Sequence, residues 1–415
     1  MLYKKKNKWY HLNVSGFINV MNKKIIVPII LIALTSCSNE NFISSSSSSS
    51  SFVSSSSSVY SISSEIKDEY KIVLDEIAGE VNIHQPIQDE FLESPDIDLK
   101  SLGINGSKEL SLPEAINLSW KSTLPKDKNF DYFLVRIDEN NNFTSPLEYK
   151  VPIEENNIDI YNLKVGTKYY WNVEAMANEE SITSEIETFT TFFNYPRNIF
   201  VEGVTNFRDV GGWIIDENTR VRQGLAYRCG RLNTSSSSTL NIEITDNGIN
   251  TMRNYLNIKS EIDLRLIENN EVGSYEESAL GSGINYYQCP MSYDGNILVN
   301  NKNMVKNIFD LLSDKTNYPL IYHCNIGTDR TGLITYLLNG LLGVNQEDLF
   351  IDYEFSNFGL INGTRSKESI KKTYVKTIDE IEGETLSEKI SNYLQEIGIT
   401  SNQIETIKEI FIEKY

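Results

Sequence analysis

The 415-residue sequence contains few of the residues that build metal centres and disulfide frameworks. Its three histidines, His11, His84 and His323, lie far apart in the chain, which makes a multi-histidine metal site difficult to build. Of four cysteines, one, Cys37, is assigned below to a lipid anchor, and the remaining three form no disulfide framework. Basic residues are also scarce, because 38 Lys and Arg face 57 Asp and Glu, for a formal net charge of −19. So acidic a protein repels nucleic acid, and we therefore expect no nucleic-acid partner. We also expect no metal, because histidine is scarce, and no cofactor.

The N-terminal region has no apolar run long enough to span a membrane. Its apolar stretch, from Ile25 to Leu34, is too short. A short apolar run with a lysine-containing flank is typical of a signal peptide. The following Thr35-Ser36-Cys37 completes a pattern that resembles the lipobox of bacterial lipoproteins, which implies a lipid on Cys37. An ordinary secretory signal is the alternative. We expect a signal peptide over residues 1–36, with Met21 as the true start, and a lipid anchor on the extracellular face of the cell membrane.

Serine dominates the next segment, and such a composition cannot bury enough apolar surface to fold. Residues 37–64 are therefore predicted to be the lipidated cysteine and a serine-rich tether. Residues 65–92 are predicted to be a linker with one short helix, because apolar residues recur there at helical spacing. These residues are Ile66, Tyr70, Val73, Leu74 and Ile77.

Short alternating segments predict a β-sandwich over residues 93–193. The predicted strands are residues 115–120, 132–137, 168–173 and 186–191. Trp120 on an early strand and the turn from Leu163 through Gly166 to Tyr169 resemble a fibronectin type III domain. The resemblance implies adhesion or substrate docking, and a simple spacer is the favoured alternative.

Residues 318–343 predict a strand, a tight loop and a helix. The loop holds Cys324 and, six positions later, Arg330. A loop that closes into a helix N-terminus directs several N–H groups and the positive end of the helix dipole to one point, which suits an anion. The same field favours the thiolate of Cys324, and Arg330 adds a fork of donors that matches phosphate oxygens.

The run His323-Cys324-x5-Arg330-Thr331-Gly332 resembles the phosphate loop of the protein tyrosine phosphatase superfamily. The resemblance implies that Cys324 is the nucleophile and that Arg330 stabilises the transferring phosphoryl group. His323 is expected to orient the loop rather than act as a base. The expected phosphate-binding residues are Asn325, Ile326, Gly327, Thr328 and Thr331.

Arginine placement supports a phosphatase domain over residues 195–415, since eight of the eleven arginines fall between Arg197 and Arg265. The segments 206–212, 227–232 and 262–265 resemble those of the secreted bacterial tyrosine and lipid phosphatase branch. This implies supporting roles for Arg208, Asp209, Asp263 and Arg265. Alternatively, each arginine only ties strands together through a carboxylate such as Asp209 or Asp263. The run 352–357 resembles a family segment beneath the phosphate loop.

A phosphatase also needs an acid that protonates the leaving oxygen. Asp294 is the first candidate, because its loop follows a predicted strand and precedes Cys324 by thirty residues, like the mobile acid loop of the superfamily. Asp329, inside the phosphate loop, is the second, because bound phosphate would raise its pKa. The alternative for Asp329 is a salt bridge to Arg208 or Arg265. Thr328 stands where the branch commonly has lysine, which favours phosphotyrosine over lipid substrates.

The sequence thus predicts a multidomain protein, with a fibronectin type III-like β-sandwich followed by an α/β tyrosine-phosphatase-like domain on a mostly parallel sheet. The expected function is hydrolysis of phosphotyrosine in proteins, or of related small phosphomonoesters, through a phosphocysteine. A catalytically silent adhesin that acts through the sandwich is the alternative, and sulfur transfer or arsenate reduction fits less well. Cys229 and Cys289 could pair with each other, or either could protect Cys324 as a reversible disulfide.

Overall fold

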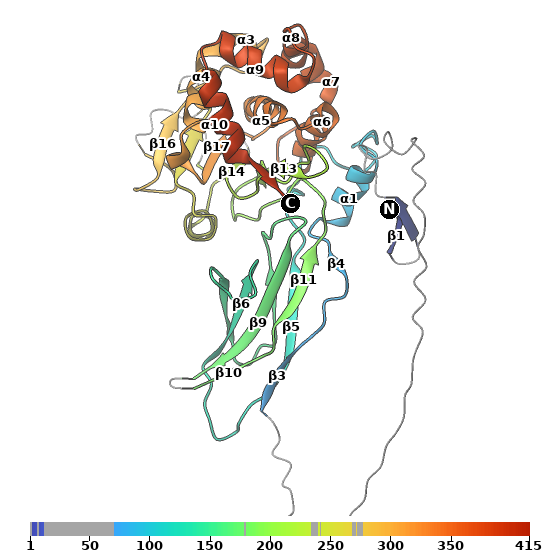
Figure 1. The fold of residues 1–415 in the computed structure, drawn as a ribbon, viewed down its shortest axis with the longest axis vertical. Coiled ribbons are helices and arrows are strands. Elements are labelled where there is room, and N and C mark those ends of the chain that lie inside the picture. Colours follow the sequence, from blue (N-terminus) through green and yellow to red (C-terminus); the bar gives the residue numbers. More distant parts are fainter. Residues whose placement is uncertain are drawn as a thin grey trace, which may run out of the picture. The chain divides into compact units, whose positions relative to one another are not determined.

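The computed structural model describes residues 2–5, 8–11, 70–177, 180–233, 240, 242–267, 271 and 277–415 (Figure 1). They fall into two units that divide between Glu69 and Tyr70. In the first unit, β1 (Leu2–Lys5) and β2 (Lys8–His11) pair as antiparallel strands. The predicted signal core, Cys37 and the serine tether lie outside the described residues. Within the described ranges, no helix has the length and apolarity needed to cross a membrane.

The second unit begins with two β-sheets around one core. The first sheet has the order β3 (Lys71–Leu74), β5 (Ile116–Thr123), β8 (Asn157–Ile160). The second has the order β4 (Glu80–Val81), β11 (Glu187–Thr191), β9 (Lys168–Met176), β6 (Tyr132–Asp138), β7 (Leu147–Pro152), with β10 (Ser181–Thr183) on β9. Trp120 from one sheet and Trp171 from the other are fully buried in the shared core. The four predicted strands are thus confirmed, while the likeness to fibronectin type III stays a prediction.

The helix predicted from Ile66 to Ile77 is wrong in its position. Residues Lys71–Leu74 form strand β3, which pairs antiparallel with β5. Ile72 is buried while its neighbours Lys71 and Val73 are exposed, so the side chains alternate with the period of two that a strand requires. The short helix of this region is instead α1 (Pro86–Glu93), in which Pro86 occupies the first turn.

Helix α1 and the loop after it pack on the C-terminal domain rather than on the sandwich. Phe91 is fully buried with its ring centroid 6.2 Å from that of Phe355 and 5.7 Å from that of Phe358. The backbone N–H of Leu110 donates to the carbonyl of Phe358 at 2.6 Å. The chain therefore contacts the C-terminal domain before it enters most of the sandwich, as well as after it.

A five-stranded sheet forms the centre of the C-terminal domain. Its order is β12 (Arg208–Asp209), β14 (Ala226–Cys229), β17 (Leu320–His323), β15 (Ser260–Asp263), β16 (Asn285–Gln288). Only the β12–β14 pair is antiparallel, which confirms the predicted mostly parallel sheet. A separate ribbon joins β13 (Thr219–Val221) to β18 (Ile412–Lys414). The parallel strands align their carboxyl ends at one edge, where ligands bind in open α/β sheets.

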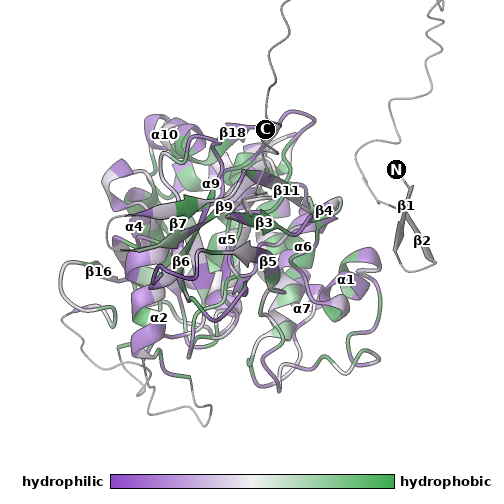
Figure 2. Cartoon of the chain, turned by 90° about the horizontal axis from the view of Figure 1, so that it is seen from below, coloured by the Kyte–Doolittle hydropathy of each residue, from purple (hydrophilic) through white to green (hydrophobic). Residues whose placement is uncertain are grey.

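The central helix is α5 (Asp329–Leu342), whose residues are almost all buried. The helices that accompany it in this domain are α2 (Asp246–Asn250), α3 (Ile297–Asn300), α4 (Lys302–Leu312), α6 (Gln346–Phe355), α7 (Lys367–Ile370), α8 (Lys376–Asp379), α9 (Leu386–Glu396) and α10 (Ser401–Phe411). Thr400 caps α10 in a capping box with Gln403. In Figure 2 the ribbons of α1 and α10 change between hydrophobic green and hydrophilic purple, as expected for amphipathic helices.

Candidate active site

The phosphate loop connects β17 to α5 at the carboxyl edge of the parallel sheet. Gly327 has a φ of +72°, and a Cβ atom there would lie 2.4 Å from the backbone of Cys229 on the neighbouring strand. Only glycine fits this position without displacing the strand. The sequence pattern of strand, tight turn and helix therefore folds locally as predicted, with Cys324 directly after the strand.

Three side chains from other segments hold the loop by its carbonyl groups. The Asn206 amide donates to two of them at 3.1 and 3.0 Å, Arg228 donates to one at 2.8 Å, and Arg231 donates to another at 3.4 Å. The acceptors belong to Asn325, Ile326 and Gly327. Across the described part of the chain, the N–H groups of residues 325–328 have no hydrogen-bond acceptor. The loop thus keeps its donors for an anion.

Behind the loop, Arg208 and Arg228 form a buried ion cluster with Asp352. Arg208 donates to one oxygen of Asp352 at 2.7 Å, and Arg228 donates to the other at 2.5 Å. All three side chains are at most 5% exposed. Arg208 also donates to the Asn206 side chain at 2.5 Å. Arg208, predicted to be a supporting residue, is thus connected to the loop only indirectly among the described residues, through Asn206 and through the carboxylate that it shares with Arg228.

The other predicted supporting residue of this region, Asp209, pairs with Arg197 at 2.7 Å and accepts from the backbone of Gly211 and Gly224. Arg197 in turn donates to the carbonyl of Leu163 at the base of the sandwich. This carboxylate joins elements of the fold and does not reach the phosphate loop through any contact of the described residues.

Cys324 is 1% exposed, and its thiol is free, as are those of Cys229 and Cys289. Burial alone would raise the pKa of Cys324, but the charge of Arg330 and the nearby Thr331 outweigh it and the net pKa is lowered. The Thr331 hydroxyl is buried and makes no hydrogen bond of regular geometry among the described residues. By contrast, burial raises the pKa of Cys289 to about 12. The direction of the pKa shift therefore distinguishes Cys324 from Cys229 and Cys289, whose pKa values are raised.

Arg330 is held by a glutamate that no sequence motif indicated. Both terminal nitrogens of Arg330 donate to Glu271, at 2.7 and 2.8 Å, and one also reaches the carbonyls of Leu264 and Met291 at 3.3 Å. The Tyr293 ring centroid lies 5.3 Å from the guanidinium carbon. Nε of Arg330 has no protein acceptor in the described ranges and stays available to a phosphate oxygen.

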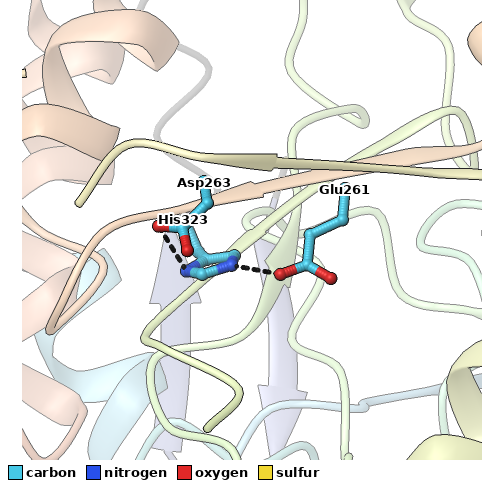
Figure 3. Close-up of side chains that lie close together, drawn as sticks. All are labelled: Glu261, Asp263 and His323. Atoms are coloured by element: carbon cyan, nitrogen blue, oxygen red, sulfur yellow. Dashed lines mark hydrogen bonds and ion pairs between the residues drawn. The ribbon is translucent and has the colours of Figure 1, made fainter. Parts of the chain in front are cut away.

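His323, the last residue of β17, lies between two carboxylates (Figure 3). Its Nε2 is 2.9 Å from Glu261 and its Nδ1 is 3.9 Å from Asp263. Burial lowers its pKa, but Asp263 and Glu261 raise it more, so the net pKa is raised. Arg265 in turn binds Asp263 at 2.7 Å. His323, Asp263 and Arg265 thus form one buried ion network next to the loop, and their supporting role stays a prediction.

The same three residues, Glu261, Asp263 and His323, have ligand atoms within 4.8 Å of one another, close enough to hold a metal ion. The donors are nevertheless already used: Glu261 also accepts from the Ser278 hydroxyl, and Asp263 also accepts from the Tyr286 hydroxyl at 3.0 Å. A histidine with a raised pKa is also a poor metal ligand, because metals bind the neutral imidazole. The donor set fits an ion network better than a metal.

The two candidate acids differ in their surroundings. Asp294 is exposed, and among the described residues its carboxylate makes no hydrogen bond or ion pair, although its loop neighbour Tyr293 reaches Arg330. Asp329 accepts from the Tyr353 hydroxyl at 3.1 Å and pairs with Arg365 at 3.1 Å. Neither arginine named in the sequence-based alternative, Arg208 or Arg265, is its partner.

Arg365 is a second residue that sequence reasoning missed. Its backbone is held by the Asn357 side chain, which donates to the carbonyl at 2.9 Å and accepts from the N–H at 2.7 Å. Its guanidinium interacts electrostatically with Cys324 as well as with Asp329. The segment 352–357 therefore supports the phosphate loop twice, through Asp352 and through Asn357. Its resemblance to a family segment was the only signal for this.

A cysteine–arginine phosphate loop at the carboxyl edge of a parallel sheet defines a cysteine-dependent phosphatase architecture. The family model described as "Tyrosine phosphatase family" matches residues 199–413, just over half of the chain. The chain therefore belongs to the tyrosine phosphatase family.

Two solved structures are similar at low identity. One is the core catalytic domain of the PP-IP phosphatase SIW14 from S. cerevisiae in complex with citrate. Its sequence identity is 20%, the match covers 38% of this chain and 89% of that chain, and the TM-score is 0.26. The other is the Siw14 catalytic core, which is 18% identical in sequence. This match covers 41% of this chain and 88% of that chain, with a TM-score of 0.28. At such values the likeness carries no functional argument. The curated proteins include no match.

Proposed function

We propose that this protein is a cysteine-dependent phosphatase that hydrolyses phosphotyrosine or related phosphomonoesters through a phosphocysteine. The single observation that carries the proposal is the loop of free N–H groups around a thiol whose pKa is lowered beside Arg330. Such a cradle stabilises the charge that develops on the equatorial oxygens of a transferring phosphoryl group.

In the first step, the Cys324 thiolate attacks phosphorus, the bond from phosphorus to the leaving oxygen breaks, and an acid gives that oxygen a proton. In the second step, water attacks the phosphocysteine, and phosphate and the thiolate are released. The chain's own cations supply the charge stabilisation in both steps, so the proposal requires no metal.

We propose Asp329 rather than Asp294 as the acid. Its charge interacts with both Cys324 and Arg330, whereas Asp294 is exposed. After it loses its proton, Asp329 has Arg365 and the Tyr353 hydroxyl as partners that stabilise its anion. The same anion can then accept a proton from the attacking water.

The test is hydrolysis of p-nitrophenyl phosphate, phenyl phosphate and a phosphotyrosine peptide by the full chain, with a chelator and a reductant present. Cys324→Ser is expected to abolish turnover. Asp329→Asn is expected to slow phenyl phosphate far more than p-nitrophenyl phosphate, because the better leaving group needs less protonation, while Asp294→Asn serves as the matched control. A folded wild-type chain that hydrolyses none of these esters would refute the proposal.

We also propose that the protein is anchored through Cys37 to the outer face of a bacterial cell membrane. The support is the sequence pattern of the apolar run and the following cysteine. Cys37→Ala is expected to abolish incorporation of labelled palmitate and to move the protein from the membrane fraction to the medium. Retention of the label in the variant would refute lipidation at this residue.

A further inference from the structure

The loop that follows α1 contacts both of the segments that support the phosphate loop. On one side it adds hydrogen bonds to residues 357–362: the N–H of Gly106 donates to the carbonyl of Asn357 at 3.1 Å, and the N–H groups of Ile361 and Asn362 donate to the carbonyl of Gly106 at 2.9 and 2.8 Å. A Cβ atom on Gly106 would lie 2.5 Å from the Ile361 side chain. The two loops therefore fit together without space for an added methyl group.

Glu109, in the same loop, lies where the two supporting segments meet. The N–H of Leu360 donates to the Thr205 hydroxyl at 2.7 Å, and that hydroxyl donates to a Glu109 carboxylate oxygen. The same oxygen is 3.3 Å from the Leu360 nitrogen. The Glu109 carboxylate, in the loop after α1, thus joins Thr205 to Leu360.

Each joined segment leads directly to the catalytic loop. Thr205 precedes Asn206, whose amide holds two loop carbonyls, and Gly359 packs so closely that a Cβ atom there would lie 2.7 Å from the Asn206 side chain. In the other direction the segment continues to Arg365, which pairs with Asp329. A shift at Glu109 would therefore reach both the phosphate cradle and the proposed acid.

We propose that Glu109 is a positioning residue of the phosphatase site, which sets the relative placement of the phosphate loop and its acid from outside the family's own sequence span. This rests on the proposed phosphatase function. Catalysis depends on sub-ångström placement of reacting groups, and small displacements from remote changes cost up to about 100-fold in rate. Glu109 acts through Thr205 and does not contact substrate.

The test compares Glu109→Ala, Glu109→Gln and the control Asp96→Asn in the full chain, with p-nitrophenyl phosphate and phenyl phosphate as substrates. Asp96 lies in the same segment and pairs with Lys367 at 2.9 Å, but its side chain is 92% exposed. We expect Glu109→Ala to lower kcat/KM for phenyl phosphate about tenfold or more. The fold-loss in kcat/KM for p-nitrophenyl phosphate should be at least threefold smaller. Glu109→Gln keeps an acceptor for Thr205 and should stay within about threefold of wild type, as should Asp96→Asn.

A purely structural role would not change the dependence on the leaving group at temperatures where circular dichroism shows each variant fully folded. Equal losses on both esters, or wild-type rates in Glu109→Ala, would overturn the inference while the phosphatase function stands. A second variant, Gly106→Ala, disturbs the packing of the same loop against residues 357–362 and should show the same leaving-group dependence. A wild-type chain inert toward both esters would overturn the proposed function and this inference together.

Discussion

Asp352 offers the sharpest test of how the site is supported, because its one carboxylate serves two buried guanidinium groups. Replacing it with asparagine keeps the size and one oxygen acceptor but removes the negative charge between Arg208 and Arg228. Removing one partner of a buried ion pair costs about 3–5 kcal/mol of the free energy of unfolding. Burial raises the pKa of Asp352, but the two arginines outweigh it and the net pKa is lowered. The stabilisation it provides is thus present at neutral pH and lost as pH falls through the folded pKa.

Asp348, one helical turn earlier in α6, is the matched control. It is 7% exposed, and burial raises its pKa to about 6. Because its pKa is raised, the Asp348 carboxyl destabilises the fold increasingly as pH rises from the unfolded pKa to the folded pKa and fully above it, so Asp348→Asn should gain up to about 3 kcal/mol at pH 7 and little near pH 4. The same substitution therefore has opposite effects at two positions one turn apart.

The assay is urea unfolding followed by circular dichroism at pH 7 and near pH 4, together with inhibition by inorganic phosphate. Asp352→Asn should also weaken phosphate binding, because Arg228 holds the carbonyl of Gly327 in the loop. Losses of equal size in Asp352→Asn and Asp348→Asn would refute the reasoning, since burial of a carboxyl group alone would then explain both.

Three further changes test separate parts of the structure. Iodoacetate should modify Cys324 before Cys289 at pH 7, with a rate that falls as pH drops below the lowered pKa of Cys324. Mass spectrometry of the peptides measures this order, and modification of Cys289 first would show that the assignment is wrong. Glu271→Gln should lower kcat/KM about tenfold, because the amide lacks the carboxylate charge and offers Arg330 only one oxygen acceptor in place of two, whereas an increase would mean that Glu271 competes with substrate. Phe91→Ala should cost about 3–5 kcal/mol in urea unfolding, and a loss below about 1 kcal/mol would contradict the packing of α1 described above.

The phosphate loop was predictable from the sequence because its chemistry is local. Cys324, Gly327 and Arg330 lie within seven residues, between an apolar strand and an apolar helix, so one short pattern fixes both geometry and role. The alternating strands of the sandwich follow from equally local periodicity. The error at Lys71–Leu74 arose because a short run of mixed residues matches both a period of two and a period of 3.6.

The partners of the loop were not predictable, because each comes from a distant segment. Glu271 precedes Arg330 by 59 positions and Glu109 precedes Thr205 by 96. No spacing rule connects such pairs, and any of the 57 acidic residues could have been the partner. Arg365 was hidden in the same way, since its role depends on the fold that brings Asn357 beside it.

The docking of α1 has a consequence for the order in which the chain acquires its structure during synthesis. Phe91 leaves the ribosome roughly 260 residues before Phe355 and Phe358, which at about 5–20 residues per second is a delay of roughly 13–50 s. Throughout that time Phe91 lacks these two partners, and only near neighbours of the same cluster, such as Leu99 and Ile104, can cover it. Newly made chains should therefore depend on chaperones at α1, whereas a circularly permuted chain that places residues 84–112 after residue 415 would present both surfaces within seconds of each other.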